Sequence, residues 1–314
     1  MTELDLIYKI ASLYFEDSQT QQEIANRMGI SRIKVSRLLQ QARTRGVVEI
    51  SLKKPKGNFV EVEKQISSKW NLKEVILTGS DTADDKELLL HLGKATAEYS
   101  RRVISGNETI SLTWGRTLSS FIQNLPGMDF PKLKIVQMLG GLGSPEADVH
   151  SSDLVRRFSD KTGSIGRILS APGVVSSLEV KEGLLKDPHI RETLQMAEKA
   201  DLAFVGIGNP AQDSLLMTQG NLITRQTLSE LKEAGAVGDI SLRFFDEKGK
   251  IVGHPINERV IGLGAEEIRN IPRVVAVAGG QDKKRTIKGA LNSGLIDVLI
   301  TDYKTGKNLL EEQS

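Results

Sequence analysis

The stretch TQQEIANRMGISRIKVSRLL, residues 20–39, contains two short helical patterns separated by a single glycine. Thr20 stands three residues before Glu23, which is the spacing of a capping box at the start of a helix. The apolar residues that follow share one helical face: Ile24, Ala25 and Met28. Gly29 then supplies the left-handed conformation that ends many helices. The spacing therefore predicts a short helix that stops at Gly29.

A second helical pattern begins directly after this glycine. Ser31 is a residue type that caps helix N-termini. The inner face behind it is apolar: Val35, Leu38, Leu39 and Ala42. Two helices that meet steeply need a small residue at their contact, here Ala25, a glycine in the turn and an apolar residue such as Val35 on the second helix. Together these features predict a helix-turn-helix, whose second helix enters the DNA major groove.

The outer face of the second helix carries side chains suited to guanine edges and phosphate groups. The predicted DNA-binding residues are Thr20, Gln21, Ser31, Arg32, Lys34, Ser36, Arg37 and Arg43. Arg43 lies later on the helix and is expected to meet phosphates rather than base edges. The alternative is a small helical bundle that serves dimerisation alone, but the coincidence of the glycine, the small residue and the basic face favours DNA binding.

The formal net charge of +2 conceals an uneven distribution. Residues 27–56 contain nine Lys or Arg and one acidic residue, whereas residues 58–314 contain 32 basic and 34 acidic residues. A basic block beside a nearly neutral remainder is typical of a polyanion-binding module joined to a second domain. A solvated helix face would explain the charge alone, and the helix spacing decides against it.

The composition excludes several classes of protein. The chain has 314 residues, 39% hydrophobic and 26% charged, as in a globular protein with room for two or three domains. The absence of cysteine excludes disulfides and thiolate metal sites. No apolar run approaches the roughly 18 to 20 residues of a membrane span. The first residues are acidic and helix-like, unlike a signal peptide. We therefore expect a cytoplasmic protein without metal or cofactor.

The segments around the helix-turn-helix complete a first domain. Residues 3–16 have helical spacing, and residues 47–52 alternate in a way that predicts a strand, as part of a wing. Residues 53–57 are rich in lysine and contain Pro and Gly, which predicts a linker. Residues 59–70 are expected to form a connecting or dimerising helix. We therefore assign residues 1–57 to the DNA-binding domain and its linker.

Residues 58–314 form the larger part, which we interpret as an effector and oligomerisation domain. Short β-branched segments predict strands at 75–77, 110–113, 135–139, 165–169, 203–207, 240–245, 274–278 and 298–301. Helical patterns lie between most of them, at 86–104, 116–124, 151–161, 189–199, 224–234, 282–292 and 303–312. This alternation predicts an α/β fold with a doubly wound parallel sheet, in which ligands bind beyond the carboxyl ends of the strands.

Glycine and polar residues follow four of these predicted strands, at 114–117, 140–144, 208–210 and 279–283. Glycine lets backbone N–H groups approach an anion, and a helix N-terminus adds its dipole. Arg116 and Lys283 add positive charge, and Thr117 adds a hydroxyl. The convergence of these loops predicts a site for a small phosphorylated molecule. Each loop alone more often reflects a tight turn, and the glycines of 140–144 match no nucleotide-binding motif.

An ordered series of short motifs along nearly the whole chain resembles the SorC family of bacterial sugar-responsive transcription regulators. The motifs are the helix-turn-helix at 20–39, TWGRT at 113–117, LGG at 139–141, AP at 171–172, VGIG at 205–208, GDI at 238–240, RFFD at 243–246, AGG at 278–280 with Lys283, and LITD at 299–302. The resemblance implies an effector domain similar to sugar-phosphate isomerases of the glucosamine-6-phosphate deaminase and ribose-5-phosphate isomerase type. It also implies a phosphorylated sugar as effector and a tetramer on DNA.

Carried over by position, the resemblance implies a set of effector-binding residues: Thr113, Gly115, Arg116, Thr117, Gly140, Gly141, Asp239, Arg243, Gly279, Gly280 and Lys283. The loop of Gly115 to Thr117 and Lys283 would hold the phosphate. The paired glycines, Asp239 and Arg243 would lie near the sugar. Some relatives have a lysine beside the paired glycines that attacks an open-chain aldehyde. The corresponding neighbours here are Leu139 and Leu142, so covalent capture is not expected.

An enzyme that interconverts phosphosugars is a rival interpretation, since such chemistry needs a carboxylate or His beside the reacting carbons. Of the four His, only His150 could reach the site, and its contact with ligand is left open. Asp239 is the best carboxylate candidate, although a hydrogen bond to a sugar hydroxyl is the milder role for it. We expect a regulator and not an enzyme. The four glycine-bearing strand ends also argue against an architectural DNA-binding protein without an effector.

One helix-turn-helix offers a small contact surface, so specific recognition requires at least two on a repeated operator. We therefore expect a homo-oligomer, either a dimer or a tetramer. Residues 1–16 and the helix at 58–70 are the expected contacts between subunits.

Overall fold

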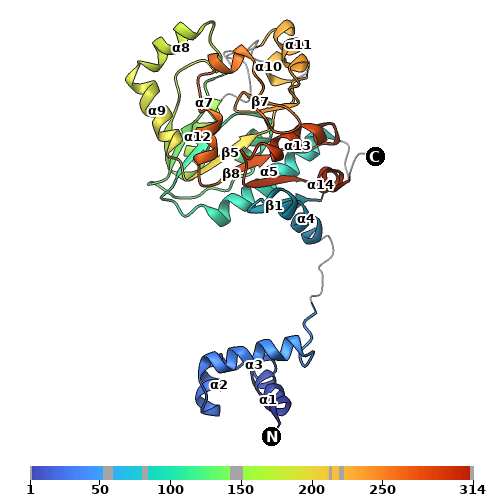
Figure 1. The fold of residues 1–314 in the computed structure, drawn as a ribbon. Coiled ribbons are helices and arrows are strands. Elements are labelled where there is room, and N and C mark those ends of the chain that lie inside the picture. Colours follow the sequence, from blue (N-terminus) through green and yellow to red (C-terminus); the bar gives the residue numbers. More distant parts are fainter. Residues whose placement is uncertain are drawn as a thin grey trace. The chain divides into compact units, whose positions relative to one another are not determined.

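The computed structural model describes residues 2–51, 59–79, 84–141, 151–211, 214–218 and 223–311. The chain divides into two compact units, residues 1–58 and residues 59–314 (Figure 1). Each unit has hydrophobic clusters of its own.

The first unit consists of three helices, α1 (Glu3–Phe15), α2 (Gln21–Met28) and α3 (Arg32–Thr44). Thr2 and Thr20 cap the first two helices in capping boxes, and Ser31 caps the third. Gly29 ends α2 with a φ of 65°, in the left-handed region. The apolar faces of all three helices meet in one core, which includes Ile10, Ile24 and Val35. The predicted helix-turn-helix is therefore confirmed.

The strand predicted at residues 47–52 is wrong for the residues that are described. Residues 47–51 form no strand. The N–H groups of Val47 and Val48 donate to the Ala42 carbonyl at 2.8 and 3.1 Å, which closes the end of α3. A strand needs a hydrogen-bonding partner, and the described residues of this unit contain no second strand. Residue 52 and the predicted linker 53–57 lie outside the described residues.

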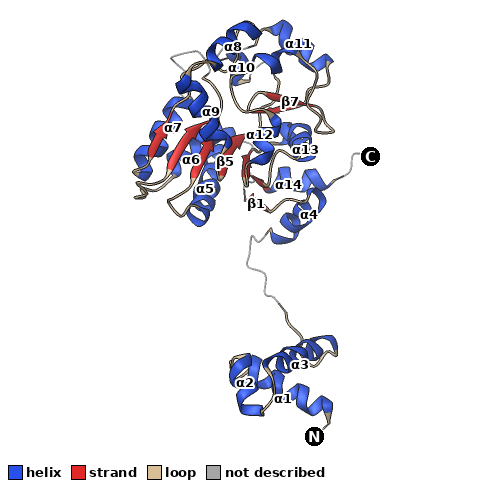
Figure 2. Ribbon diagram, turned by 60° about the vertical axis from the view of Figure 1, so that its left-hand side comes forward, coloured by secondary structure: helices blue, strands red, loops and turns tan. Residues whose placement is uncertain are grey.

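The second unit is built on a seven-stranded parallel sheet (Figure 2). Its strands, from edge to edge, are β1 (Glu74–Thr78), β9 (Val298–Asp302), β8 (Val274–Val277), β5 (Leu202–Gly206), β2 (Thr109–Leu112), β3 (Lys134–Gln137) and β4 (Ile165–Arg167). Every pairing in this sheet is parallel. The central strands are buried on both sides, as a doubly wound sheet requires.

One predicted strand, 240–245, is wrong as a single strand. The structure has two short antiparallel strands there, β6 (Gly238–Ile240) and β7 (Arg243–Phe245), which form a separate hairpin. Ser241 and Leu242 make the turn between them, with φ values of 54° and 60°. Two-residue hairpin turns of this kind favour Asn and Gly. The sequence Ser-Leu therefore gave no turn signal.

Helices cover both faces of the sheet. One face is covered by α5 (Asp85–Val103), α6 (Arg116–Asn124) and α7 (Ser151–Thr162). The opposite face is covered by α4 (Val60–Trp70), α9 (Pro188–Glu198), α12 (Ala265–Asn270), α13 (Lys284–Asn292) and α14 (Tyr303–Leu310). Alternate sheet residues enter the two cores, with Phe204 on the first face and Val205 on the second.

The predicted connecting or dimerising helix is α4, which packs on β1 and α14 of the second unit. Its Trp70 indole N–H donates to the Asn292 side chain at 2.8 Å, and Phe59 stacks on Tyr303 with ring centroids 4.6 Å apart. The inner side of α4 is therefore part of the second unit. Its role between subunits stays a prediction.

A third, smaller core surrounds the hairpin. It is formed with α10 (Leu215–Thr218), α11 (Arg225–Glu233) and the 3-10 helix η1 (Pro255–Arg259). Leu139, two residues beyond β3, is part of this core, so the hairpin lies at the carboxyl-end edge of the sheet. The remaining elements are α8 (Leu178–Leu185) and the 3-10 helix η2 (Gln281–Lys283). Helices α8, α10 and α12 were not predicted from the sequence.

Candidate functional site

Helix α3 presents a basic outer surface. Its inner residues are buried in the first core, whereas Arg32, Lys34, Ser36 and Arg37 are all exposed. Within the described part of the chain, none of these three cations has an ion-pair partner. Unpaired cations on one helix face are free to meet phosphates and guanine edges.

Thr20 and Ser31, two of the predicted DNA contacts, also hold the helices together. The Thr20 hydroxyl donates to the Glu23 carboxylate at 2.9 Å and accepts the Glu23 N–H at 3.3 Å, so capping occupies it. The Ser31 hydroxyl oxygen accepts the Lys34 N–H at 3.2 Å, which leaves its own proton free to donate. Gln21, at the first position of α2, is half-buried. Contact of these residues with DNA stays a prediction.

Two further side chains complete the outer surface of α3. The exposed Arg43 lies over the Phe15 ring, 5.7 Å from its centroid, so the guanidinium is held near the end of the helix. Ile33 has 70% of its surface exposed between Arg32 and Lys34. An aliphatic group in that position is suited to a thymine methyl. Ile33 was not predicted as a DNA contact, because only polar side chains on this face were expected to contact DNA.

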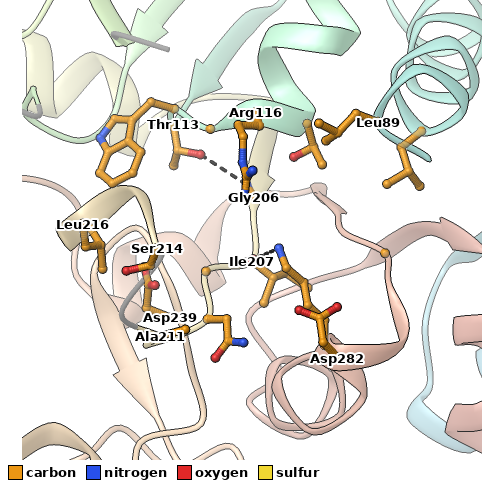
Figure 3. A pocket seen from close by; sticks show the side chains of 18 of the residues that line it. Leu89, Thr113, Arg116, Gly206, Ile207, Ala211, Ser214, Leu216, Asp239 and Asp282 are labelled. Carbon is orange, nitrogen blue, oxygen red and sulfur yellow. Dashed lines mark hydrogen bonds between the residues drawn. The ribbon is translucent and has the colours of Figure 1, made fainter. Parts of the chain in front are cut away.

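In the second unit, a cavity of about 200 Å³ lies at the carboxyl ends of the central strands. The strand order reverses there, because β2 leads to β3 and β4 on one side while β5 leads to β8 and β9 on the other. Such a switch point is where open α/β sheets bind ligands. Figure 3 shows the side chains around this cavity, including Thr113, Arg116 and Asp239.

Seven of the predicted effector-binding residues line this cavity: Thr113, Gly115, Arg116, Thr117, Asp239, Gly279 and Lys283. They come from the ends of β2 and β8, from α6 and from the hairpin. Residues far apart in the sequence therefore converge, as the glycine-bearing strand ends predicted. Their contact with an effector stays a prediction.

The loop after β2 presents a helix N-terminus to the cavity. Gly115, with a φ of 145°, precedes α6 and provides no side-chain cap for its first N–H groups. Only glycine adopts this conformation readily. Thr113 and Thr117 bind neighbouring strands: the Thr113 hydroxyl accepts the Gly206 N–H at 3.3 Å (Figure 3), and Thr117 donates to the Val277 carbonyl at 3.2 Å. An uncapped N-terminus of this kind is suited to an anion.

Two cations face the same cavity. The Lys283 ammonium donates to the Ile207 carbonyl at 3.2 Å. Burial lowers the pKa of Lys283; the carboxylate of Asp282 opposes this effect, and the guanidinium of Arg116 adds to it. An anion between Arg116 and Lys283 would relieve their mutual repulsion.

Asp239 is the most deeply buried carboxylate of the cavity, with 6% of its surface exposed. Burial raises its pKa to about 6, although the Leu242 N–H and the Lys283 charge both favour the ionised form. The Leu242 N–H donates to Asp239 Oδ2 at 3.0 Å. A Cβ at Gly208 would clash with Asp239 Oδ1, so a glycine is needed there. Asp239 thus stabilises the hairpin turn, and its contact with a sugar hydroxyl stays a prediction.

The hairpin turn holds Ser241 and Leu242 in the left-handed region. Each such non-glycine residue costs on the order of 1 to 2 kcal/mol. Leu242 is fully buried in the third core, which offsets this cost. Ser241 lines the cavity, and its hydroxyl oxygen is buried without a hydrogen-bond partner in the described structure. Ser241 was not predicted as a site residue, because a Ser-Leu pair gives no turn signal.

The paired glycines, Gly140 and Gly141, do not line the cavity. The Gly140 N–H donates to the Ile261 carbonyl and the Gly141 N–H to the Ala171 carbonyl, both at 2.9 Å. A Cβ at Gly140 would clash with the backbone of Pro172. Gly140 therefore serves close backbone packing, whereas a Cβ at Gly141 would come no closer than 4.0 Å to the Ala171 carbonyl oxygen. In their place, Leu139 lines the cavity and offers no amine for covalent capture.

Arg243 and Gly280 also lie outside the residues that line the cavity. The Arg243 guanidinium is 7% exposed and donates to three backbone carbonyls, those of Leu263, Asn257 and Gly262, at 2.7 to 3.1 Å. The Gly280 N–H donates to Asp302 Oδ2 at 3.0 Å and to the Thr305 hydroxyl at 3.1 Å. Their hydrogen-bonding groups are occupied by the fold, which sequence spacing could not reveal.

Several residues of the cavity were missed. The start of α5 contributes Asp85, Leu88, Leu89 and Leu92. The segment after β5 contributes Asn209, Ala211, Ser214 and Leu216. No local motif marks these residues, since α5 reaches the cavity through its packing against α6 and the sheet strands β1 and β9. The Gly208-Asn209-Pro210 turn was the one available signal.

Of the four histidines, only His150 was expected to be able to reach the site, and its contact with ligand was left open. His150 lies outside the described residues. His91 bonds the Gly79 carbonyl, His189 lies at the first turn of α9, and His254 caps η1 beside Glu230. None of these three lines the cavity.

Across the described ranges, no cluster of three or more His, Asp or Glu side chains could hold a metal ion. None of the helices described in the structure is long and apolar enough to cross a membrane.

Comparisons with known proteins agree with this arrangement. The family model "Putative sugar-binding domain" matches residues 54–311, and the model "Sigma-70, region 4" matches residues 9–45. The chain is 31% identical to a deoxyribonucleoside regulator of Bacillus subtilis over 98% of this chain and 97% of that protein. It is 28% identical to a sorbitol operon regulator of Klebsiella pneumoniae over 98% of both.

Solved structures give the same result. The full-length sorbitol operon regulator SorC from Klebsiella pneumoniae matches with a TM-score of 0.74 and 27% identity, covering 99% of this chain and 100% of that one. A DeoR family transcriptional regulator from Listeria monocytogenes matches with a TM-score of 0.74 and 32% identity, covering 80% of this chain and 99% of that one. The chain therefore belongs to the SorC family of sugar-binding transcriptional regulators, DNA-binding proteins with a sugar-binding effector domain.

Proposed function

We propose that the protein controls a carbohydrate-utilisation operon in response to a phosphorylated sugar that binds in the cavity of the second unit. The observation that carries this proposal is the convergence of Arg116, Lys283 and the uncapped N-terminus of α6 on one cavity. The effector acts without a metal or cofactor in this proposal.

The positive charges at Arg116, at Lys283 and at the N-terminus of α6 favour an effector with a phosphate group over a neutral sugar. Arg116 and Lys283 line the same cavity, and Lys283 is partly buried, so its charge-assisted hydrogen bonds are stronger than those at an exposed surface. The carboxylates of Asp85, Asp239 and Asp282 line the same cavity. Polar groups of both signs suit a molecule with a charged end and a hydroxyl-bearing end. The sugar portion would contact Asp239 and the segment after β5.

The names of the relatives support a carbohydrate-utilisation operon. One relative is named a deoxyribonucleoside regulator and another a sorbitol operon regulator. Both align with nearly the whole of this chain. We propose the same kind of role, control of a carbohydrate-utilisation operon, for this protein, and the experiment below identifies the sugar.

We further propose that the protein acts on DNA as a homo-oligomer, a dimer or a tetramer. A single helix-turn-helix has too small a contact surface for high specificity, so two must bind a repeated operator. A ligand changes this binding only if it has different affinities for the DNA-competent and DNA-incompetent arrangements. A phosphosugar that draws the loops at 115–117 and 279–283 together would shift subunit contacts and hence the spacing of the paired α3 helices.

The proposal is tested by thermal unfolding of the full chain with a panel of sugar phosphates and their unphosphorylated counterparts. A ligand held by the folded state raises the melting temperature by mass action. We expect at least one sugar phosphate to raise it and to change operator affinity in a gel-shift titration. Stabilisation by unphosphorylated sugars alone, or by no sugar of the panel, would contradict the phosphorylated effector.

A further inference from the structure

The hairpin turn contains a hydroxyl for which the described fold provides no partner. Ser241 is 4% exposed, lines the cavity and has a hydroxyl oxygen that is buried without a hydrogen bond. Most buried polar atoms in proteins are satisfied, so an unpartnered hydroxyl at a cavity wall requires an explanation.

The backbone of the turn strengthens this point. Ser241 and Leu242 both have positive φ, a conformation that Gly or Asn adopts at lower cost. Leu242 compensates by complete burial in the third core. Ser241 gains neither apolar burial of comparable size nor a hydrogen bond. Strained residues of this kind cluster at ligand sites, where the strain fixes a group in place for its ligand.

Asp239 lies two residues before Ser241 and lines the same cavity. Its Oδ2 accepts the Leu242 N–H at 3.0 Å, so the turn is bonded to the carboxylate side chain. The two polar groups are therefore held in one rigid unit. A carboxylate accepts hydrogen bonds, whereas a hydroxyl both donates and accepts. This combination suits neighbouring hydroxyl groups of a sugar.

We infer that Ser241 is a specificity-determining residue that binds a hydroxyl group of the sugar, beside Asp239. This inference rests on the proposed function, since it assigns the sugar-reading end of the same cavity. A hydroxyl group of the bound sugar provides the hydrogen-bond partner that the Ser241 hydroxyl lacks in the described structure. A sugar phosphate without the matching hydroxyl leaves Ser241 unsatisfied and binds more weakly.

The test compares the wild-type full chain with Ser241→Ala, Ser241→Gly and the control Ser229→Ala. Ser229 is exposed on α11 and does not line the cavity. Affinities are measured by calorimetry for ribose 5-phosphate, 2-deoxyribose 5-phosphate, fructose 6-phosphate, glucose 6-phosphate and 2-deoxyglucose 6-phosphate. Ser241→Ala removes the hydroxyl and keeps the backbone strain, whereas Ser241→Gly removes both.

We expect both Ser241 variants to bind the sugar phosphate that the wild type binds most tightly with about 5- to 10-fold lower affinity. This is the usual net contribution of one hydrogen bond. The variants should also discriminate less between that sugar and the others of the panel, and Ser229→Ala should match the wild type. Wild-type affinity in Ser241→Ala would overturn the inference. If Ser241→Ala binds more weakly but Ser241→Gly binds with wild-type affinity, the inference is also overturned. The loss in Ser241→Ala would then come from backbone strain and not from the missing hydroxyl. Failure of the wild type to bind any of these probes would instead reject the proposed function on which the inference rests.

Discussion

The two regions that carry the function differ in how they hold their positive charge. On α3, Arg32, Lys34 and Arg37 are exposed and have no ion-pair partner among the described residues. In the cavity, Lys283 is partly buried and already donates to a backbone carbonyl. Salt screens exposed cations strongly and partly buried ones much less, and only an anion that enters the cavity can contact Lys283. The first region therefore suits a long polyanion, and the second suits one small anion.

Gly140→Ala tests the interpretation that Gly140 serves packing rather than ligand binding. The added Cβ would clash with the Pro172 backbone, which cannot move without disturbing the neighbouring bridges. We expect a loss of about 3 kcal/mol of unfolding free energy, measured by urea denaturation. Gly183→Ala is the control, because a Cβ there meets no atom within 4 Å. If Gly140→Ala has wild-type stability but binds the effector more weakly, Gly140 contributes to the ligand site instead.

Lys283→Ala tests the short-range character of the cavity. Loss of one charge-assisted hydrogen bond should raise the effector concentration needed for half-response by about 10- to 100-fold. Operator affinity without effector should stay near the wild-type value, as measured by gel shift. Lys284→Ala is the matched control, since Lys284 is the next residue and does not line the cavity. A Lys283 variant that responds at wild-type effector concentrations would place the phosphate elsewhere.

Arg32→Ala and Arg37→Ala test the long-range character of α3. Each should weaken specific operator binding by about 1 to 3 kcal/mol if the guanidinium contacts a base edge. Arg43→Ala should weaken binding to all sequences alike and reduce the slope of affinity against salt by about one. Fluorescence anisotropy at several salt concentrations separates the two effects. Unchanged operator affinity in both the Arg32 and Arg37 variants would mean that another face reads the DNA.

Asp239→Asn tests whether the buried carboxylate ionises at a cost. The folded-state pKa of about 6 lies above the ordinary value of 3.8, so the folded state binds more protons than the unfolded state between these values. Stability from this group is then present at low pH and lost as the pH rises through about 6. The wild type should gain about 2 kcal/mol of unfolding free energy relative to Asp239→Asn between pH 7 and pH 4. A difference that is constant with pH in chemical denaturation would exclude this effect.

The sequence predicted the two regions to different depths. Thr20, Glu23, Gly29 and Ser31 act within a few residues of one another, so local spacing was enough to locate the helix-turn-helix. Gly140 could not be interpreted in this way, because its neighbour Pro172 is distant in the sequence. The sequence pattern of a strand followed by glycine is the same whether the glycine makes room for a ligand or for another segment of backbone.

The sheet shows the same limit. Seven predicted strands lie within it, because short runs rich in β-branched and other apolar residues indicate strands from local sequence alone. The hairpin at 238–245 was missed, since the burial of Leu242 compensates for a turn that local propensity disfavours. No local pattern indicated that Arg243 donates to three carbonyls instead of facing the cavity, because these carbonyls lie 14 to 20 residues away in the sequence.

A serine or threonine hydroxyl carries a single proton, and in Thr117 that proton is given to the Val277 carbonyl. A phosphate can receive it only if this carbonyl loses its donor. Val277 is the last residue of β8, directly before the segment that leads to Gly279 and Lys283. If the proposed phosphate takes this proton, its binding at α6 would change the hydrogen bonding of the main chain at the end of β8. The phosphate would then compete with an internal acceptor, which would weaken its binding and favour its release.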